Sequence, residues 1–293
     1  MIISFKARQA LFQRVDSISL GLFRFLFGFL LCVEMFVFNS EARFTDYYIK
    51  PPFHFTYPLF DLLGLKPWPA PFLWTDFYLM QISAIGIMLG LFTRASFIVF
   101  SLTFGYLFFM ESAYYTNHYY LIFLLSFLMC FGHSGSRFSV DALINKKSRK
   151  EFVDYWELFL LRFQICIVFF YAGVAKLNED WLFHALPMRI SLIKDFTLFG
   201  FPFHPKWLAF FLSWAGMILD LGLGILLFIN RWHWLAFSGL CMFNGMNILL
   251  FGPAIHTFPY LMMSSYLLFL PTHTVKEFIE KVFKRKVIDQ KAI

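Results

Sequence analysis

The stretch Ser17–Phe38, SISLGLFRFLFGFLLCVEMFVF, decides the class of fold. It is long enough to cross a bilayer core of about 30 Å as one α-helix. Arg24 and Glu34 are the charged residues inside it. No small-residue cleavage site follows the run, which is also longer than the apolar core of a signal peptide. We therefore expect a retained membrane helix.

The whole chain has the composition of a membrane protein. It has 293 residues, of which 59% are hydrophobic and 15% are charged, whereas soluble domains carry about 25% charged residues. The prediction is an all-α, polytopic membrane helical bundle with one domain over residues 1–274 and a basic tail over 275–293. About eight transmembrane helices are expected, at Ser17–Phe38, Leu73–Leu91, Ala95–Glu111, His118–Gly132, Trp156–Lys176, Trp207–Ile229, Trp232–Phe251 and His256–Leu270.

The distribution of Lys and Arg predicts the orientation of the chain. The side that carries both termini holds sixteen of these residues, and the opposite side holds six. The positive-inside rule then puts both termini in the cytoplasm and turns the loops 39–72 and 177–206 outward. Apolar and basic residues alternate in Val275–Lys286, which suits a short helix on an anionic inner leaflet. In a membrane protein this distribution is more informative than the net charge of +7, so we expect membrane lipid as a partner and no nucleic acid.

The cysteines indicate neither a redox site nor a metal site. They lie inside apolar segments and form no Cys-x-x-Cys pair: Cys32, Cys130, Cys166 and Cys241. Spacing of this kind predicts small buried hydrophobic residues. We therefore expect no metal.

Three ionisable residues fall at one depth of the predicted spans, about 20 Å from their outer ends. They are Arg24, Arg162 and Asp220. Charged groups inside a membrane are costly and therefore need partners or a function. We interpret the three as an ion-paired structural cluster that joins the first, fifth and sixth spans. The alternative is a path for protons or anions.

A second set of polar residues lies near the outer level of the spans. It contains an amine, imidazoles, a carboxylate and amides, from Glu34, Asn117, His118, Lys176, Asn244, Asn247 and His256. A buried Lys176 can act as a base if desolvation outweighs the helix C-terminus and a nearby Glu34, which both favour the cation. The alternative is that Lys176 and His118 only mark the interface, with the lysine reaching toward water.

At this point the sequence resembles a known family. The run Gln164–Trp181, QICIVFFYAGVAKLNEDW, resembles the fifth-helix segment of the vitamin K-dependent γ-carboxylases. Further similar runs follow the family's order, at Val15–Phe29, Gly86–Arg94, Asn117–Leu121, Ser139–Leu143 and Leu219–Gly224. The same fold defines the wider family of horizontally transferred transmembrane (HTTM) proteins. The resemblance covers nearly the whole chain and implies the membrane domain of that family.

The resemblance also implies a chemistry. In the carboxylases a lysine deprotonates vitamin K hydroquinone, O₂ adds, and the resulting alkoxide removes a γ-proton from a peptide glutamate that CO₂ then captures. Lys176 occupies the position of that lysine, and Asn117 and His118 match the residues that assist it. The implied cofactor-binding residues are Glu34, Asn244, Asn247 and His256. The implied partners are membrane lipid, vitamin K or another quinol, and a secreted peptide that contains Glu.

Two departures from the family leave alternatives open. A histidine precedes an asparagine in the family's seventh helix, whereas Asn244 and Asn247 stand here and His256 follows further on. The carboxylases also continue into a β-rich extracytoplasmic domain that binds the peptide, and this chain ends at Ile293. We expect that a separate protein supplies that domain, that the chain is a truncated copy, or that its chemistry differs. The alternative functions are a non-redox maturation or export factor for a secreted peptide, and a quinone-binding protein.

Overall fold

The computed structural model describes residues 9–195, 197–198, 201–202, 205–255, 257–277 and 281. Within it the chain divides into two compact units. Unit 1 combines Met1–Leu161 with Thr272–Ile293, and unit 2 is Arg162–Pro271. Each unit is described by itself below.

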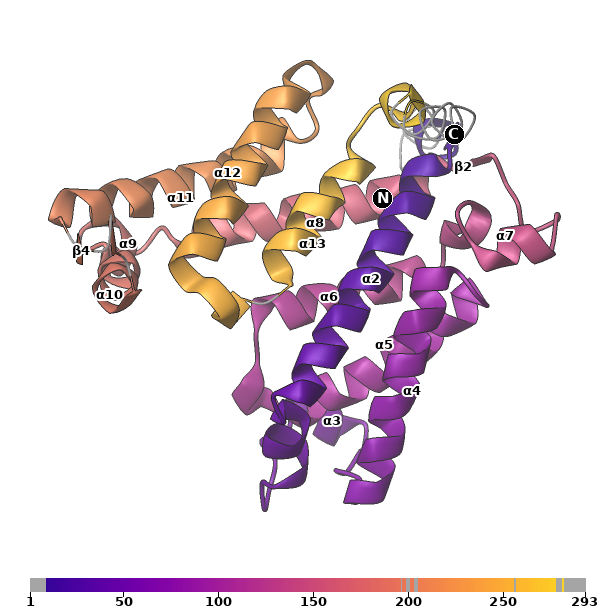
Figure 1. Ribbon diagram of the computed structural model, residues 1–293, viewed down its shortest axis with the longest axis horizontal. Helices are drawn as coiled ribbons and strands as arrows, with labels where there is room; N and C mark the ends of the chain where they lie inside the picture. The colour runs from indigo at the N-terminus through magenta and orange to yellow at the C-terminus, as the bar shows by residue number, and fades with distance from the viewer. Residues whose placement is uncertain are drawn as a thin grey trace, which may run out of the picture. The chain divides into compact units, whose positions relative to one another are not determined.

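The described residues contain six helices that are long and apolar enough to cross a membrane (Figure 1). They are α2 (Ile18–Ser40), α4 (Ala70–Leu89), α5 (Thr93–Met110), α8 (Tyr155–Ala175), α11 (Lys206–Leu226) and α12 (His233–Phe251). The predicted helical membrane bundle is confirmed, and the chain is an integral membrane protein.

The other two predicted spans are shorter than expected. The fourth is α6 (Asn117–Met129), whose thirteen residues reach only about 20 Å. In place of the eighth, α13 (Phe258–Ser265) is followed by the 3₁₀ turn η6 (Tyr266–Leu268). The hydroxyls of Ser264 and Ser265 donate to carbonyls three residues earlier, a local bond that competes with regular helix.

Short elements connect the long helices. Unit 1 also contains β1 (Arg14–Asp16), η1 (Thr45–Ile49), α3 (Pro58–Leu62), η2 (Ser112–Tyr114), η3 (Ser134–Ser136), α7 (Val140–Ile144) and β2 (Phe152–Asp154). Unit 2 also contains α9 (Glu179–Leu182), α10 (Leu186–Asp195), β3 (Thr197–Leu198), β4 (Phe201–Pro202), η4 (Asn230–Trp232) and η5 (Gly252–Ile255). β1 pairs antiparallel with β2, and β3 with β4.

Aromatic side chains fill the core of unit 1. α2 packs on α4, α4 on α5, and α5 on α6. Phe23, Phe27, Phe77 and Phe97 are fully buried between them. A Cβ atom at Gly28 would lie 2.4 Å from the backbone nitrogen of Met88. The missing side chain therefore lets α2 and α4 approach backbone to backbone, as small residues do in membrane helix pairs.

Arg24 joins three segments of unit 1. Its guanidinium is fully buried. Nη1 donates to the carbonyls of Ile87 and Met88 at 2.9 and 2.7 Å, and Nη2 donates to those of Arg137 and Phe138. The first two carbonyls belong to the last turn of α4, where helical carbonyls lack partners. Arg24 therefore caps α4 and holds the chain that leads into α7.

The described part of the predicted tail returns to the start of α2. Residues 272–277 are helical, Val275 is buried, and Lys276 Nζ lies 2.5 Å from Asp16 Oδ2. The other oxygen of Asp16 accepts from the backbone nitrogen of Ile18. This lysine therefore pairs with a carboxylate of the same unit. Apart from 275–277 and 281, the tail lies outside the described residues.

Close helix contact also organises unit 2. A Cβ atom at Gly173 of α8 would lie 2.6 Å from Leu221 Cγ and 2.9 Å from the Leu221 nitrogen. Gly224, further along α11, faces the carbonyl of Cys166 in the same way, at 3.1 Å. The two helices therefore run antiparallel and touch at glycines. α10 packs on α11 and α12 through a core that includes Met188, Leu192, Ala209 and Leu250.

Candidate functional site

Lys176 follows the last residue of α8 and turns back toward α11. Its Nζ atom donates to the carboxylate of Asp220 and, at 3.2 Å, to the carbonyl of Ala172. The side chain of Lys176 is 17% exposed, whereas that of Asp220 is 2% exposed. The pair is therefore largely buried, and the lysine is its more exposed partner.

The turn after α8 supplies a third contact to the lysine. The Trp181 ring centroid lies 5.2 Å from Lys176 Nζ, within the range of a cation–π interaction. Asn178 positions this ring, because its side chain donates to the Ala175 carbonyl and accepts from the Trp181 nitrogen. Ser213 of α11 donates to the Trp181 carbonyl at 2.8 Å. The amine is thus held between α8, α9 and α11.

The pair gives Asp220 a partner that the predicted ion cluster did not contain. Asp220 is bound to Lys176. Arg162 Nε donates to the carbonyl of Leu268 at 2.6 Å. The prediction assumed that the outer end of α11 lies level with Lys176. Leu221, fourteen residues after the predicted start at Trp207, lies against Gly173, three residues before Lys176. The helix α11 is therefore displaced by about 16 Å along its axis relative to that assumption.

A lysine and an aspartate in direct contact can share one proton. The net charge is the same whether the proton lies on the amine or on the carboxylate. In a low-dielectric place, a neutral pair costs less desolvation than two separated charges. The direct hydrogen bond between Lys176 and Asp220 therefore allows a proton to pass between the amine and the carboxyl group.

Asn117 and His118 begin α6 in unit 1. The Tyr115 hydroxyl donates to Asn117 Oδ1 at 3.0 Å, and burial raises the pKa of this phenol, so that it stays a donor at neutral pH. Thr116 caps α6 by accepting from the Tyr119 nitrogen, and its hydroxyl lies 3.4 Å from His118 Nε2. Asn117 is exposed and His118 is half-buried.

Glu34 is joined to the same end of α6. The carboxylate is buried and accepts a 2.9 Å hydrogen bond from the Tyr119 hydroxyl. The rings of Tyr119 and His118 are in edge contact, with centroids 4.5 Å apart. Within unit 1 the structure therefore brings Glu34, Tyr119 and His118 together. That Lys176 acts with Asn117 and His118 stays a prediction.

The two predicted amides of α12 differ in their surroundings. Asn244 is fully buried, and its Nδ2 donates to the Leu240 carbonyl at 2.9 Å. Its Oδ1 has no hydrogen-bond partner in the part of the chain that the structure describes. Such an atom is costly and marks a place where a ligand hydroxyl could bind. Asn247 is half-buried, and His256 lies outside the described residues.

With this geometry in hand, comparison with known proteins gives the family. A model of the HTTM domain matches residues 12–273. The chain belongs to the HTTM family. The HTTM domain is associated with the vitamin K-dependent carboxylases, so the resemblance found in the sequence is confirmed at the level of the family. No solved structure matches the chain.

Two contacts of the HTTM domain were missed by the sequence analysis. Asp220 was assigned to a structural cluster, although it belongs to the run Leu219–Gly224 that resembles the family. Tyr119 was not considered, although it follows His118 directly. Their positions within family-like runs were the available signal. The pairing itself depends on the helix offset and on side-chain direction, which residue spacing does not contain.

Proposed function

We propose that this HTTM protein is a quinol-dependent γ-glutamyl carboxylase of the membrane. Its co-substrate is vitamin K hydroquinone or a related quinol, and its substrate is a glutamate of a secreted peptide. Lys176 is the base that receives the hydroquinone proton. The observation that carries the proposal is the contact between Lys176 and Asp220, in a protein whose family is associated with this chemistry.

Asp220 gives Lys176 a way to be both neutral and held in place. With the shared proton on Asp220, the amine has a free electron pair and is ready to accept a proton. After it does so, Asp220 keeps the shared proton, and its carboxyl oxygen still accepts a hydrogen bond from the new ammonium group. The ring of Trp181 also favours the cationic product. The pair thus supports general base catalysis.

The polar atoms of unit 2 suit a hydroquinone. A buried carbonyl oxygen such as Asn244 Oδ1, which lacks a partner among the described residues, can accept a phenolic hydrogen. We assign Asn244 and Asn247 to holding the ring hydroxyls, and Asn117, His118 and Glu34 to orienting the reacting oxygen. When bound, the hydroquinone together with O₂ supplies the oxidation that drives γ-proton removal, and CO₂ supplies the new carboxyl group.

The positive-inside rule supports an orientation for this enzyme. Both termini are assigned to the cytoplasm, and Lys176 to the extracytoplasmic side, where a secreted peptide would arrive. The quinol enters from the bilayer.

The test uses the full chain in lipid nanodiscs. It is given vitamin K hydroquinone, O₂, bicarbonate and a short peptide that contains Glu. Quinone epoxide is measured by chromatography, and the gain of CO₂ by mass spectrometry of the peptide. Lys176→Ala should abolish both products, whereas Lys206→Ala, an exposed lysine of α11, should leave them unchanged.

One outcome of this test would favour a maturation or export factor over a carboxylase. If folded wild-type protein binds the quinol but forms no epoxide, the proposal is contradicted. A maturation or export factor without redox chemistry would then be the better account, with the Lys176–Asp220 pair as a structural ion pair.

A further inference from the structure

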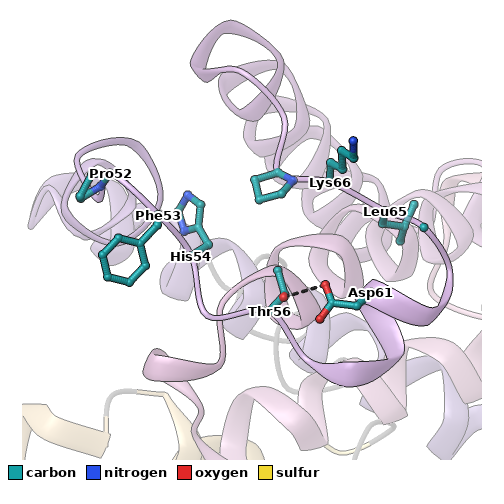
Figure 2. A pocket seen from close by; sticks show the side chains of 9 residues that line it. Pro52, Phe53, His54, Thr56, Asp61, Leu65 and Lys66 are labelled. Atoms are coloured by element: carbon teal, nitrogen blue, oxygen red, sulfur yellow. Dashed lines mark hydrogen bonds between the residues drawn. The ribbon is translucent and has the colours of Figure 1, made fainter.

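Unit 1 contains a cavity of about 560 Å³ between the segments 52–56 and 61–67 (Figure 2). Its lining combines apolar and polar side chains: Pro52, Phe53, His54, Thr56, Asp61, Leu65, Lys66 and Pro67, together with Gly64. Its volume lies in the range of small-molecule sites. None of these residues belongs to the site proposed for the quinol.

Both segments that line the cavity are hydrogen-bonded to residues near the end of α5. On one side the Tyr57 nitrogen donates to the Phe109 carbonyl at 3.0 Å, and the Ser112 nitrogen to the Phe55 carbonyl at 2.7 Å. On the other side the Tyr106 hydroxyl donates to the Lys66 carbonyl at 3.0 Å and accepts from the Trp68 nitrogen at 2.9 Å. The cavity is therefore preformed.

His54 is held in one orientation within the wall. Its Nδ1 lies 2.9 Å from Glu111 Oε2, and the two side chains are 8% and 3% exposed. The other oxygen of Glu111 accepts from the Ala113 nitrogen at 3.0 Å. A buried carboxylate favours the tautomer with the proton on Nδ1. In the neutral ring, the remaining nitrogen of His54 is then a hydrogen-bond acceptor.

The cavity also carries two opposite charges that do not neutralise each other. Asp61 accepts a 2.8 Å hydrogen bond from the Thr56 hydroxyl. Neither Asp61 nor Lys66 forms an ion pair with any residue that the structure describes. Figure 2 shows His54 on one side of the space, and Asp61 and Lys66 on the other. The lining thus offers two acceptors for a cation and one ammonium for an anion.

The position of the cavity indicates where such a ligand comes from. It lies directly before α4 and against the end of α5, and the ends of membrane-spanning helices meet the headgroup region of the bilayer. Large apolar side chains stand exposed around it. Phe53 is 62% exposed, Leu62 82% and Leu63 64%. A ligand with a zwitterionic head and an apolar body would match both the lining and its surroundings.

We propose that this cavity binds the headgroup of a zwitterionic phospholipid with a primary ammonium, of the phosphatidylethanolamine type. The ammonium hydrogen-bonds to Asp61 and His54, the phosphate faces Lys66, and the acyl chains lie along the exposed apolar residues. A choline headgroup has no N–H to donate, so it binds more weakly. The proposal stands independently of the quinol chemistry.

The experiment measures lipid retention by the full chain. Delipidated protein in detergent is titrated with phosphatidylethanolamine, phosphatidylcholine or phosphatidylglycerol and followed by native mass spectrometry. The tightest single-lipid complex should form with phosphatidylethanolamine. Asp61→Asn and Lys66→Met should each lower that affinity about tenfold, the usual worth of one charged hydrogen bond.

Matched control variants come from the same connection between α2 and α4. Asp46 and Lys50 pair with each other at 2.7 Å and do not line the cavity, so Asp46→Asn and Lys50→Met should retain wild-type affinity. Melting temperatures verify that all four variants fold. Equal affinity for the three lipids, or Asp61→Asn and Lys66→Met variants that bind phosphatidylethanolamine as the wild type does, would overturn the proposal.

Discussion

The side-chain nitrogen of Lys176 lies against the carboxyl group of Asp220 and 5.2 Å from the centre of the Trp181 ring. The sequence placed the lysine at the end of one helix and the aspartate deep inside another. Their contact joins α8 to α11 and gives the proposed base a partner that can take up its proton. This contact, the packing of α8 on α11, and the hydrogen bonds of Arg24 and Tyr119 can each be tested.

The first prediction concerns the energy of the pair. Removing one partner of a buried ion pair leaves the other uncompensated and typically costs about 3–5 kcal/mol. Asp220→Ala and Lys176→Met should therefore each lower stability strongly, whereas the double variant should lose less than the sum of the two. Unfolding of the purified proteins in detergent measures this coupling. Additive losses would show that the two side chains do not interact.

The second prediction concerns the helix contact that allows the pair to form. A methyl group at Gly173 would meet the backbone of Leu221 at 2.9 Å, so Gly173→Ala should push α11 away from α8. Gly222→Ala is the control, because a Cβ atom there meets nothing within 4 Å. We expect a lower melting temperature and less epoxide from Gly173→Ala alone. Similar behaviour of the two variants would argue against close approach at Gly173.

The third prediction concerns Arg24. Its forked guanidinium serves four carbonyls, and a lysine cannot reproduce that geometry. Arg24→Lys should thus destabilise the protein by about 3 kcal/mol, since several buried acceptors lose their donors. Arg94, exposed near the start of α5, gives the control Arg94→Lys. An Arg24→Lys protein as stable as wild type would contradict the capping role.

The fourth prediction concerns Tyr119. Tyr119→Phe removes the hydroxyl that donates to Glu34 and leaves a buried carboxylate oxygen with one donor fewer, at a cost of about 1–3 kcal/mol. If Glu34 and His118 orient the quinol, turnover should fall more than stability alone explains. Tyr120→Phe, on the exposed side of the same helix, is the control. Equal turnover in both variants would remove Tyr119 from the site.

The sequence predicts features that depend on neighbouring residues, such as helices, but not the contacts between distant segments. Apolar runs identified the membrane class and the six long helices, because helix length in a bilayer follows directly from residue count. The family-like runs indicated Lys176 as the candidate base. The partner of Asp220 was not predictable, because it depends on how far α11 slides along α8. Similarly, the sequence marked Arg24 as unusual but could not show that its partners are backbone carbonyls from α4 and the chain before α7.

The most direct test of the central claim is the rate of quinone epoxide formation by Asp220→Asn. The amide keeps the size of the side chain but cannot share a proton with Lys176. If the two residues act together as the base, the rate should fall at least about a hundredfold, the lower range of general base catalysis, while the protein remains folded. A folded Asp220→Asn variant that forms epoxide at the wild-type rate would contradict the account.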